Sequence, residues 1–528
     1  MKPYMTISWD SLRLPKISTQ LWISIVFYLA TLAGAYEAAQ WISNDNMSVL
    51  IFAAVGFVLL VIAFTIVRNW RAGFYFFLVW LLFEDLIRKY LGNNMVIFFA
   101  KDCLAGLSYI SLLMAVRRKE AQAFRPPFLF LLSLFFWLAV LQMLNPYSPS
   151  PFYGILGLKI DFFYAPLMFL GYALIRDERD LYRLLRVFML LAIIIAGLGI
   201  VQAIKGPTFL NPATVQQDIR ELSTLEKATP LTSQVFFLPC SVFVSNGRFA
   251  FFLILAAIVA LGSTGYFVLS SLRGRIKMYI GLGTLAIATV LSGSRGSLLF
   301  ELISAVALCA AFLWGAPWRW GRGRRLVKAI RRSMIVMGFG LAAFMLMFPA
   351  AAASRLSYYS ETLFPSSSTY QLSQRSLGYP MAELAKAFTR PHWIVGNGTG
   401  TASLGTQYVS EFFKKPMPTV AVEEGFGQLI VEMGLLAPLL WIVWTIATVS
   451  ACWKIVRSLK ETRFFPIAVA ILWYVFLLLF PLSYMALGAY QNYVNNAFLW
   501  LLIGVLYRLP EFATQTPVIV HADTRPPV

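Results

Sequence analysis

Apolar runs of about twenty residues recur along the whole chain, and they constrain its fold more than any other feature. Clear examples are Val49–Val67, Val187–Ile204 and Met334–Ala352. Each approaches the roughly 20 residues that cross a hydrocarbon core as a helix. With 59% hydrophobic and 13% charged residues, the chain has too little polar surface for a soluble fold. The alternating segments of about ten residues that mark outer-membrane barrels do not occur. We therefore predict an all-α, polytopic integral membrane protein.

Hydropathy indicates about 12–14 transmembrane helices. The candidate spans lie near 21–42, 49–67, 72–83, 95–116, 127–144, 157–175, 187–204, 249–270, 278–292, 297–315, 333–352, 428–450, 464–483 and 489–507. If the N-terminus is cytoplasmic, about two thirds of the 44 Lys and Arg residues fall in cytoplasmic loops. Their density there is about threefold higher than in the opposite loops, as the positive-inside rule requires. Both termini are therefore expected in the cytoplasm.

The predicted domain organisation is one membrane domain with two large outer loops. Residues 1–20 form a cytoplasmic N-terminus, 21–507 the membrane domain and 508–528 a cytoplasmic tail. The loops 205–248 and 354–427 face outward, which is the periplasm if the membrane is a bacterial inner membrane. A chain whose large soluble parts all face outside is expected to work there.

The net charge of +20 is accounted for by this topology rather than by nucleic-acid binding. Its densest basic run, 319–332, is typical of a cytoplasmic loop that contacts anionic lipid headgroups. The four cysteines show no CxxC spacing, and the chain has only two histidines. We therefore predict no metal site, no disulfide framework and no cofactor.

Ionisable residues inside predicted spans are candidates for function because burying them in a membrane is costly. Two neighbouring pairs are conspicuous, Lys101-Asp102 and Lys159 with Asp161. Each pair could compensate its own charges, lie near the membrane interface, or belong to a functional site.

The hexapeptide 292–297, Ser-Gly-Ser-Arg-Gly-Ser, interrupts an apolar stretch at the outer end of two predicted spans. Free backbone N–H groups at the start of the next helix favour an anion, and the guanidinium of Arg295 can bind a phosphate. Ser294 belongs to the same turn. Arg248 begins another span at a similar depth, so both arginines together could bind a diphosphate. The alternative is a polar hairpin with an arginine that reaches the interface.

A glycine run at 396–401 is followed by Glu423 and Glu424 at the start of a predicted span. The run is similar to a dinucleotide fingerprint, but no predicted strand precedes it, so it fails the required context. A tight loop that presents backbone amides is the better interpretation. The two glutamates either activate a sugar hydroxyl as a base or provide favourable charge at a helix start.

Taken together, these segments resemble the O-antigen ligase and O-antigen polymerase superfamily of bacterial inner-membrane glycosyltransferases. The upstream segments are similar to its exopolysaccharide-polymerase branch. The resemblance covers residues 80–440 and rests on short motifs in a shared order. These motifs are Glu84–Lys89, Lys101-Asp102, Asn145-Pro146, Leu156–Lys159, Tyr164–Leu167, Ser294–Gly296, Gly396–Gly400 and Glu423–Gly434.

The resemblance implies metal-independent glycosyl transfer on the periplasmic side. The donor would be a glycan on undecaprenyl diphosphate, and the acceptor another glycan or the lipid A core. Arg295 inherits diphosphate binding by its motif and Arg248 only by its position. In addition, we expect Lys159 to add positive charge, and Ser294 and Glu424 to contact substrate. Other polysaccharide-assembly proteins are possible partners.

One position departs from the family pattern. Many ligases carry a histidine nine residues before the position of Glu432, and this chain has Glu423 there. If that histidine is the base, Glu423 would replace it, which favours a polymerase over a ligase. The hypothesis from another class is a lipid-linked glycan flippase or secondary transporter, because many spans and intramembrane charges suit it equally. No convincing internal repeat, the usual sign of such a transporter, is found.

Overall fold

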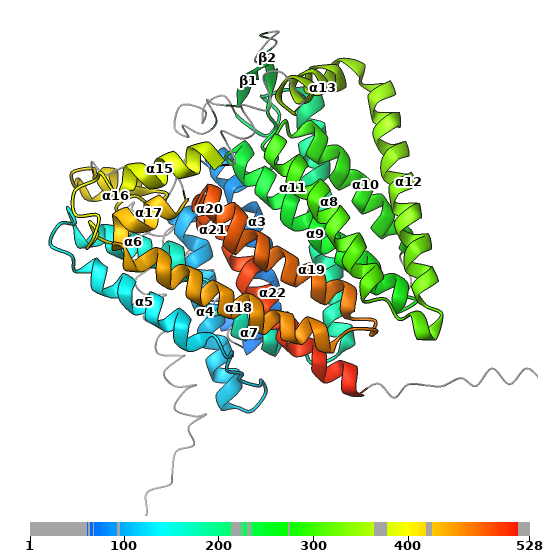
Figure 1. Cartoon of the computed structure of the whole chain (residues 1–528), viewed down its shortest axis with the longest axis horizontal. Coiled ribbons are helices and arrows are strands. Elements are labelled where there is room, and N and C mark those ends of the chain that lie inside the picture. Colours follow the sequence, from blue (N-terminus) through cyan, green and yellow to red (C-terminus); the bar gives the residue numbers. More distant parts are fainter. Residues whose placement is uncertain are drawn as a thin grey trace, which may run out of the picture. The chain divides into compact units, whose positions relative to one another are not determined.

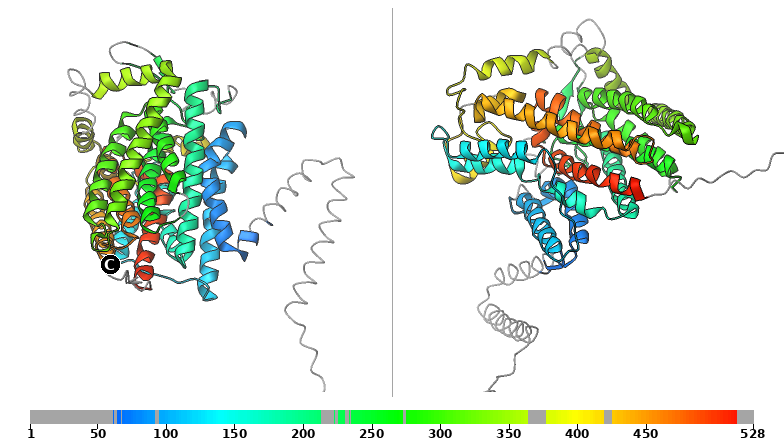
Figure 2. Two further views of the ribbon diagram at one scale, coloured as in Figure 1. Left: turned by 90° about the vertical axis from the view of Figure 1, so that its right-hand side faces the viewer. Right: turned by 60° about the horizontal axis from the view of Figure 1, so that its bottom comes forward.

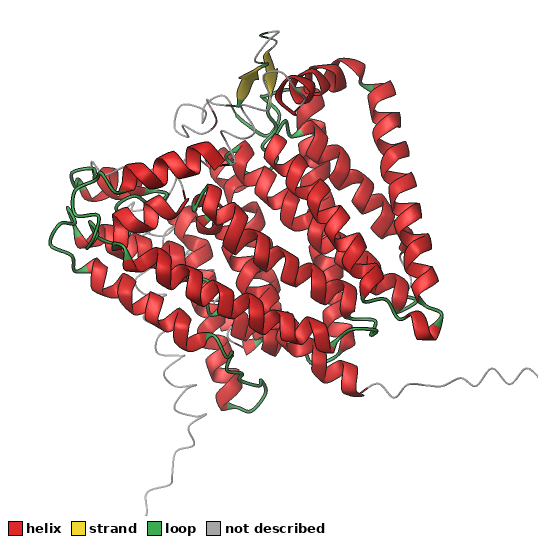
Figure 3. Cartoon of the chain, viewed as in Figure 1, coloured by secondary structure: helices red, strands yellow, loops and turns green. Residues whose placement is uncertain are grey.

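The computed structural model is mostly helical, with one small two-stranded sheet (Figure 3). It describes residues 61, 64–66, 68–91, 95–212, 222, 225–229, 233, 235–272, 275–363, 377–418 and 425–515. The chain divides into two units, Met1–Arg68 and Asn69–Val528. The predicted span at 21–42, and that at 49–67 apart from residues 61 and 64–66, lie outside the described residues.

The first half of the second unit contains long helices and the sheet. They are α3 (Trp70–Leu91), α4 (Met95–Arg117), α5 (Leu129–Met143), α6 (Pro151–Phe162), α7 (Leu167–Leu174), α8 (Glu178–Lys205), β1 (Glu226–Ala228), β2 (Val235–Phe237), α9 (Asn246–Leu269), α10 (Arg275–Leu291), α11 (Arg295–Trp314), the 3-10 helix η4 (Trp318–Trp320) and α12 (Gly323–Met347). β1 and β2 pair antiparallel, with Lys227 opposite Phe236.

The second half alternates short and long helices. They are α13 (Pro349–Leu363), α15 (Tyr379–Ala387), α16 (Thr406–Phe413), α17 (Gly425–Met433), α18 (Leu436–Ser458), α19 (Phe465–Leu477), the π-helix η6 (Leu478–Leu482), α20 (Ser483–Met485), α21 (Gly488–Gln491) and α22 (Tyr493–Gln515). Helix α15 lies within the segment 354–427 that was predicted as an outer loop, and it is at the upper left of Figure 1.

Within the described residues, eight helices are long and apolar enough to cross a membrane. They are Val96–Arg117, Pro151–Leu174, Glu178–Lys205, Asn246–Leu269, Arg295–Trp314, Gly323–Met347, Leu436–Ser458 and Phe465–Met485. Several of the long helices run side by side in the turned view on the left of Figure 2. The prediction of a mostly helical chain with many helices long and apolar enough to span a membrane is confirmed at this level.

Two predicted spans were wrong in their boundaries. The span expected at 72–83 is part of the longer helix α3, so Glu84 and Asp85 lie inside a helix and are fully buried instead of ending it. The single span expected at 428–450 is broken between α17 and α18 at Gly434, whose φ is +81°. A Cβ there would overlap the carbonyl oxygen of Ile394, so this close approach of two segments requires glycine.

The loops that charge counting placed on one side of the membrane do gather at one end of the bundle. Five of these loops or helix ends are joined by direct contacts. The contacts are Arg463–Glu178 (2.7 Å), Arg325–Ser271 (2.9 Å), Arg508–Ile175 carbonyl (2.9 Å) and Glu461 amide–Gly315 carbonyl (3.1 Å). We refer to this region as the basic end.

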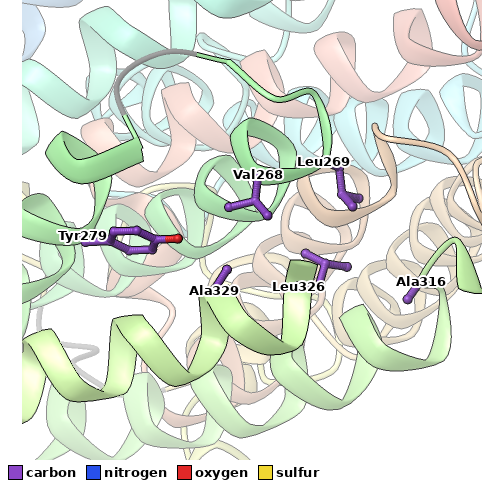
Figure 4. Close-up of a cluster of buried hydrophobic side chains, with 6 residues drawn as sticks. All are labelled: Val268, Leu269, Tyr279, Ala316, Leu326 and Ala329. Atoms are coloured by element: carbon purple, nitrogen blue, oxygen red, sulfur yellow. The ribbon is translucent and has the colours of Figure 1, made fainter. Parts of the chain in front are cut away.

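The basic run 319–332 is anchored at the basic end by apolar residues on one side of α12. Its arginines are exposed, whereas a cluster of buried residues beneath them packs α12 against α9 and α10 (Figure 4). The cluster consists of Val268, Leu269, Tyr279, Ala316, Leu326 and Ala329. This division into an exposed basic and a buried apolar side matches a helix start at a membrane surface.

The loops of the other set meet at the opposite end of the bundle. Asn145 donates to the Gly396 carbonyl (3.0 Å), Asn246 to the Ser292 carbonyl (2.8 Å), and Arg355 to the Phe237 carbonyl (2.8 Å). The described parts of both predicted outer loops, 205–248 and 354–427, are therefore connected to each other at this end.

Close packing of α7 against α22 depends on two glycines that face each other's helix. A Cβ at Gly171 would overlap the carbonyl oxygen of Leu501, and one at Gly504 would overlap that of Met168. Small residues of this kind let helix backbones approach closely in membranes.

We expect Gly504→Ala to lower the free energy of unfolding by about 1–3 kcal/mol, because the added methyl forces the two helices apart. In an unconstrained helix, by contrast, replacing glycine by alanine raises the free energy of unfolding. Gly338→Ala in α12 is the matched control, since a Cβ there meets nothing within 4 Å. Unfolding in detergent would measure both, and equal stabilities would contradict the close-packing role of Gly504.

Candidate functional site

A pocket of about 400 Å³ lies between α4, α6, α9, α16 and the joint between α20 and α22. Three cations from three different helices line it, Lys101 of α4, Lys159 of α6 and Arg248 of α9. The remaining lining is mainly apolar and aromatic and includes Phe98 and Phe251. We refer to this site as the cationic pocket.

Each cation of the pocket is held by a carboxylate behind it. The ion pairs are Lys101–Glu84 (3.0 Å), Lys159–Asp102 (2.7 Å) and Arg248–Asp85 (2.7 Å). None of these three carboxylates lines the pocket among the described residues, so the charged surface offered to a ligand is positive. Asp85 also accepts from Arg88 (3.2 Å) and from the Val244 amide (3.3 Å), which connects α3 to the start of α9.

Two helices begin at the pocket and add the positive ends of their dipoles. Ser245 caps α9 by accepting from the Arg248 amide, and Ser245 and Gly247 both line the pocket. Asn492 accepts from the Val494 amide (3.0 Å) at the start of α22 and also lines it. Helix starts favour anions, so these dipoles act in the same direction as the three side-chain charges.

Aromatic rings pack against the cations of the pocket. The ammonium of Lys101 lies 3.6 Å from the centre of the Phe98 ring, and that of Lys159 lies 4.6 Å from it. Arg248 lies over Tyr493, 5.3 Å from the ring centre. Such a combination of apolar walls and fixed cations suits a ligand that has both an anionic group and a hydrophobic part.

The structure brings together two residues that the sequence proposed for diphosphate binding. Arg248 and Lys159 line the same pocket although 89 positions separate them in the chain. Arg295 and Ser294 do not line it. Ser294 caps α11 by accepting from the Ser297 amide (3.3 Å), and the 2.8 Å hydrogen bond from Asn246 to Ser292 places this turn beside the start of α9.

Glu423 and Glu424, the proposed base and its neighbour, lie outside the described residues. The structure resumes at Gly425, where a Cβ would overlap the carbonyl oxygen of Tyr484. Ala486, two residues further along, lines the cationic pocket. The chain on the C-terminal side of Glu423 is thus close to the pocket.

The glycine loop, residues 396–405, forms a tight turn as predicted, but its amides serve the protein itself. Gly396, Gly398 and Gly400 have positive φ angles of 86°, 103° and 80°. The Gly400 amide donates to the Glu432 carboxylate at 3.1 Å, and the Ala402 amide does so at 3.0 Å. These two amides are therefore occupied.

Glu432 is fully buried and accepts two further hydrogen bonds, from Ser403 (2.8 Å) and Gln428 (3.2 Å). Burial disfavours the charged form of a carboxylate, and hydrogen bonds donated to it offset that cost. Four donors on one carboxylate make Glu432 an anchor for the glycine loop rather than a free base.

The two pairs noted in the sequence, Lys101-Asp102 and Lys159 with Asp161, do not form ion pairs within themselves. Lys101 pairs with Glu84 of α3, and Asp102 pairs with Lys159 of α6. Tyr164 also donates to Asp102 (2.9 Å). Lys101, Asp102 and Lys159 thus join different helices, which sequence distance alone could not indicate.

Two important lining residues, Gln491 and Tyr493, were missed in the sequence. Lys101 stood out there only as an intramembrane charge. Gln491 and Tyr493 belong to the segment Tyr490–Asn496, a polar run within the last predicted span, 489–507. An interruption of that kind in an apolar region could have indicated a site.

The cationic pocket thus has the features of a binding site for an amphiphilic anion, and its chemistry is defined by its own side chains. No family model, no curated protein and no solved structure matches the chain.

Proposed function

We propose that the protein is an inner-membrane glycosyltransferase that takes its glycan from undecaprenyl diphosphate. The cationic pocket carries this proposal, because three cations and two helix starts face a cavity with apolar walls. A polyprenyl diphosphate needs the same combination, because its diphosphate requires cations and its polyprenyl chain requires apolar walls. The motif resemblance adds the reaction, with a polysaccharide polymerase favoured over a ligase that acts on lipid A core.

In the proposed reaction an acceptor hydroxyl attacks the anomeric carbon of the donor. The bond from that carbon to the diphosphate oxygen breaks, and the hydroxyl proton passes to a base. Arg248, Lys101 and Lys159 would stabilise the departing diphosphate through fixed positive charge. Glu423 is the base that the motif suggests, and Arg295 would contact the donor from the neighbouring helix start.

The proposed topology has 12–14 spans, both termini in the cytoplasm and the pocket opening toward the periplasmic half. Two observations support it: the high density of Lys and Arg at the basic end, and the pocket lining contributed by both large loops of the opposite end. Ser245 belongs to the loop 205–248, and Gln407 belongs to the loop 354–427.

A lipid-linked glycan flippase is the second candidate, and one observation favours it. Between α19 and α22 the chain passes through a π-helix and two short helices, and Ala486, Gly488 and Gln491 of this segment line the pocket. Interrupted helices at a binding site are typical of secondary transporters.

Purified protein given undecaprenyl-diphosphate-linked repeat units, without nucleotide, is expected to produce a ladder of longer glycans. Gel electrophoresis and mass spectrometry would detect it. Arg295→Ala should lose the ladder, and Glu423→Gln should slow turnover more than donor binding.

The other outcomes separate the candidates. A single transfer onto added lipid A core would identify a ligase. Donor movement across proteoliposomes without any transfer would support the flippase and reject the glycosyltransferase. An unchanged ladder from Arg295→Ala would remove the role that the motif assigns to this arginine.

A further inference from the structure

A second polar site lies behind the cationic pocket, around Asp161 near the end of α6. Asp161 is 1% exposed, and no lysine or arginine of the described residues pairs with it. Its Oδ1 accepts from Gln491 (3.2 Å), and its backbone carbonyl accepts from the Tyr490 hydroxyl (2.6 Å). Its Oδ2 is buried and has no hydrogen-bond donor within the described part of the chain. A carboxylate without a partner at this depth requires a proton or a cation.

Two asparagines in the first turn of α22 present further oxygens without donors. Asn495 and Asn496 are 2% and 0% exposed, and neither Oδ1 has a donor among the described residues. Their amide nitrogens are fixed, because Asn496 donates to the Ile160 carbonyl (3.2 Å) and Asn495 to the Ala489 carbonyl (3.2 Å). Asn496 is therefore held against the residue that precedes Asp161, and Asn495 against the residue that precedes Tyr490, whose hydroxyl donates to the Asp161 carbonyl.

We propose that Asp161, Asn495 and Asn496 form a binding site for one sodium ion. All three unpartnered groups are oxygens, which is the ligand type that hard cations prefer. One carboxylate and two neutral amides give a single negative charge, which matches a monovalent ion. Calcium and magnesium sites usually contain more carboxylates or retain several waters. Protonation of Asp161 is the alternative to sodium. The proton could be donated to only one of the two asparagine oxygens, so the other would remain without a partner among the described residues.

The site is connected directly to the cationic pocket through Gln491. This side chain lines the pocket, donates to Asp161 and accepts from the Leu404 amide (3.2 Å). Sodium at Asp161 would hold Gln491 and the start of α22 in the arrangement that shapes the pocket. The proposed site is independent of glycosyl transfer, since it rests on different residues and needs no lipid donor.

The test is sodium binding to the purified full-length protein in nanodiscs, with the ionic strength held constant by choline chloride. We expect saturable binding of radioactive sodium at about one ion per chain, and a rise in Tm with sodium but not with choline. Asp161→Asn should abolish both effects. Asn496→Ala should weaken binding several-fold while Asp161 is retained, so a poorly folding Asp161 variant does not decide the result alone.

Glu301→Gln is the matched control, because Glu301 is another carboxylate inside an apolar helix, and it already accepts from Thr289 (2.7 Å). Its sodium response should equal that of the unmodified protein. Absence of sodium binding to folded protein would overturn the proposal. The proposal would equally fail if binding survived in Asp161→Asn, or if the stability of the protein responded to pH but to no alkali cation.

Discussion

Replacing Arg248 by glutamine should weaken binding of undecaprenyl diphosphate about 10- to 100-fold. A hydrogen bond to a charged group contributes about 1.5–3 kcal/mol, and each 1.4 kcal/mol is a factor of ten. Arg248 faces the pocket from the first turn of α9, where the helix dipole adds to its charge. Isothermal titration in detergent with undecaprenyl diphosphate alone would measure the affinity without requiring turnover.

The single variant also disturbs the fold, since it removes the closer of two ion pairs on the buried Asp85 and leaves the pair with Arg88. Loss of one partner from a buried pair costs about 3–5 kcal/mol. The double variant Arg248→Gln/Asp85→Asn removes both charges of this pair but also replaces the carboxylate that the buried Arg88 faces by a neutral amide, so it should be less stable than the single variant. Both variants should bind the lipid about equally weakly, because both lack the guanidinium of Arg248. The same loss of affinity at two different stabilities would therefore assign it to the lost cation rather than to the disturbed fold.

A matched control removes an ion pair far from the pocket, Arg463 and Glu178 at the basic end, which are 2.7 Å apart. The variant Arg463→Gln/Glu178→Gln should bind the lipid with unchanged affinity. Normal binding by the Arg248/Asp85 double variant would contradict the proposed role of the pocket, and Arg248 would then be a structural residue.

Much of the fold could be predicted because each span depends on its own residues. The apolar runs at 187–204 and 249–270 needed no knowledge of their neighbours, and both became helices, α8 and α9. Boundaries were less certain where packing decides them. Hydropathy ends the span 72–83 just before the charged Glu84 and Asp85, but partners on other helices allow both residues to lie within α3.

The site was predictable only in part, for the same reason. Lys159 and Arg248 stood out as cations in apolar surroundings, and both line the pocket. Nothing in the local sequence indicated that Lys101 would form its ion pair with Glu84 rather than with Asp102, its neighbour in the chain. The glycine loop illustrates the converse, because its amides seemed available to a ligand, whereas in the fold Glu432, about thirty residues away, accepts from them.

Replacing Glu432 by alanine should lower the free energy of unfolding by on the order of 4 kcal/mol. The change removes a buried carboxylate that accepts from Ser403, Gln428 and two backbone amides. The amides of Gly400 and Ala402 cannot turn to other partners, because Gly400 is wedged against Tyr153 and a Cβ there would overlap the Tyr153 carbonyl oxygen. Buried donors without acceptors each cost about 1–3 kcal/mol, so two of them account for most of the loss.

Hydrogen exchange distinguishes this structural role from a catalytic one. In Glu432→Ala the amides of Gly400 and Ala402 should exchange much faster, whereas those inside α18 should remain protected. In Glu432→Gln the exchange rates of these two amides should lie between those of Glu432→Ala and of the unmodified protein. The glutamine oxygen can still accept a hydrogen bond, whereas its NH₂ group faces other donors. Glu120→Ala is the control, since that glutamate is about half exposed and should change stability by less than about 0.5 kcal/mol. If Glu432→Ala lost activity while both stability and exchange stayed unchanged, Glu432 would act on the substrate instead of anchoring the glycine loop.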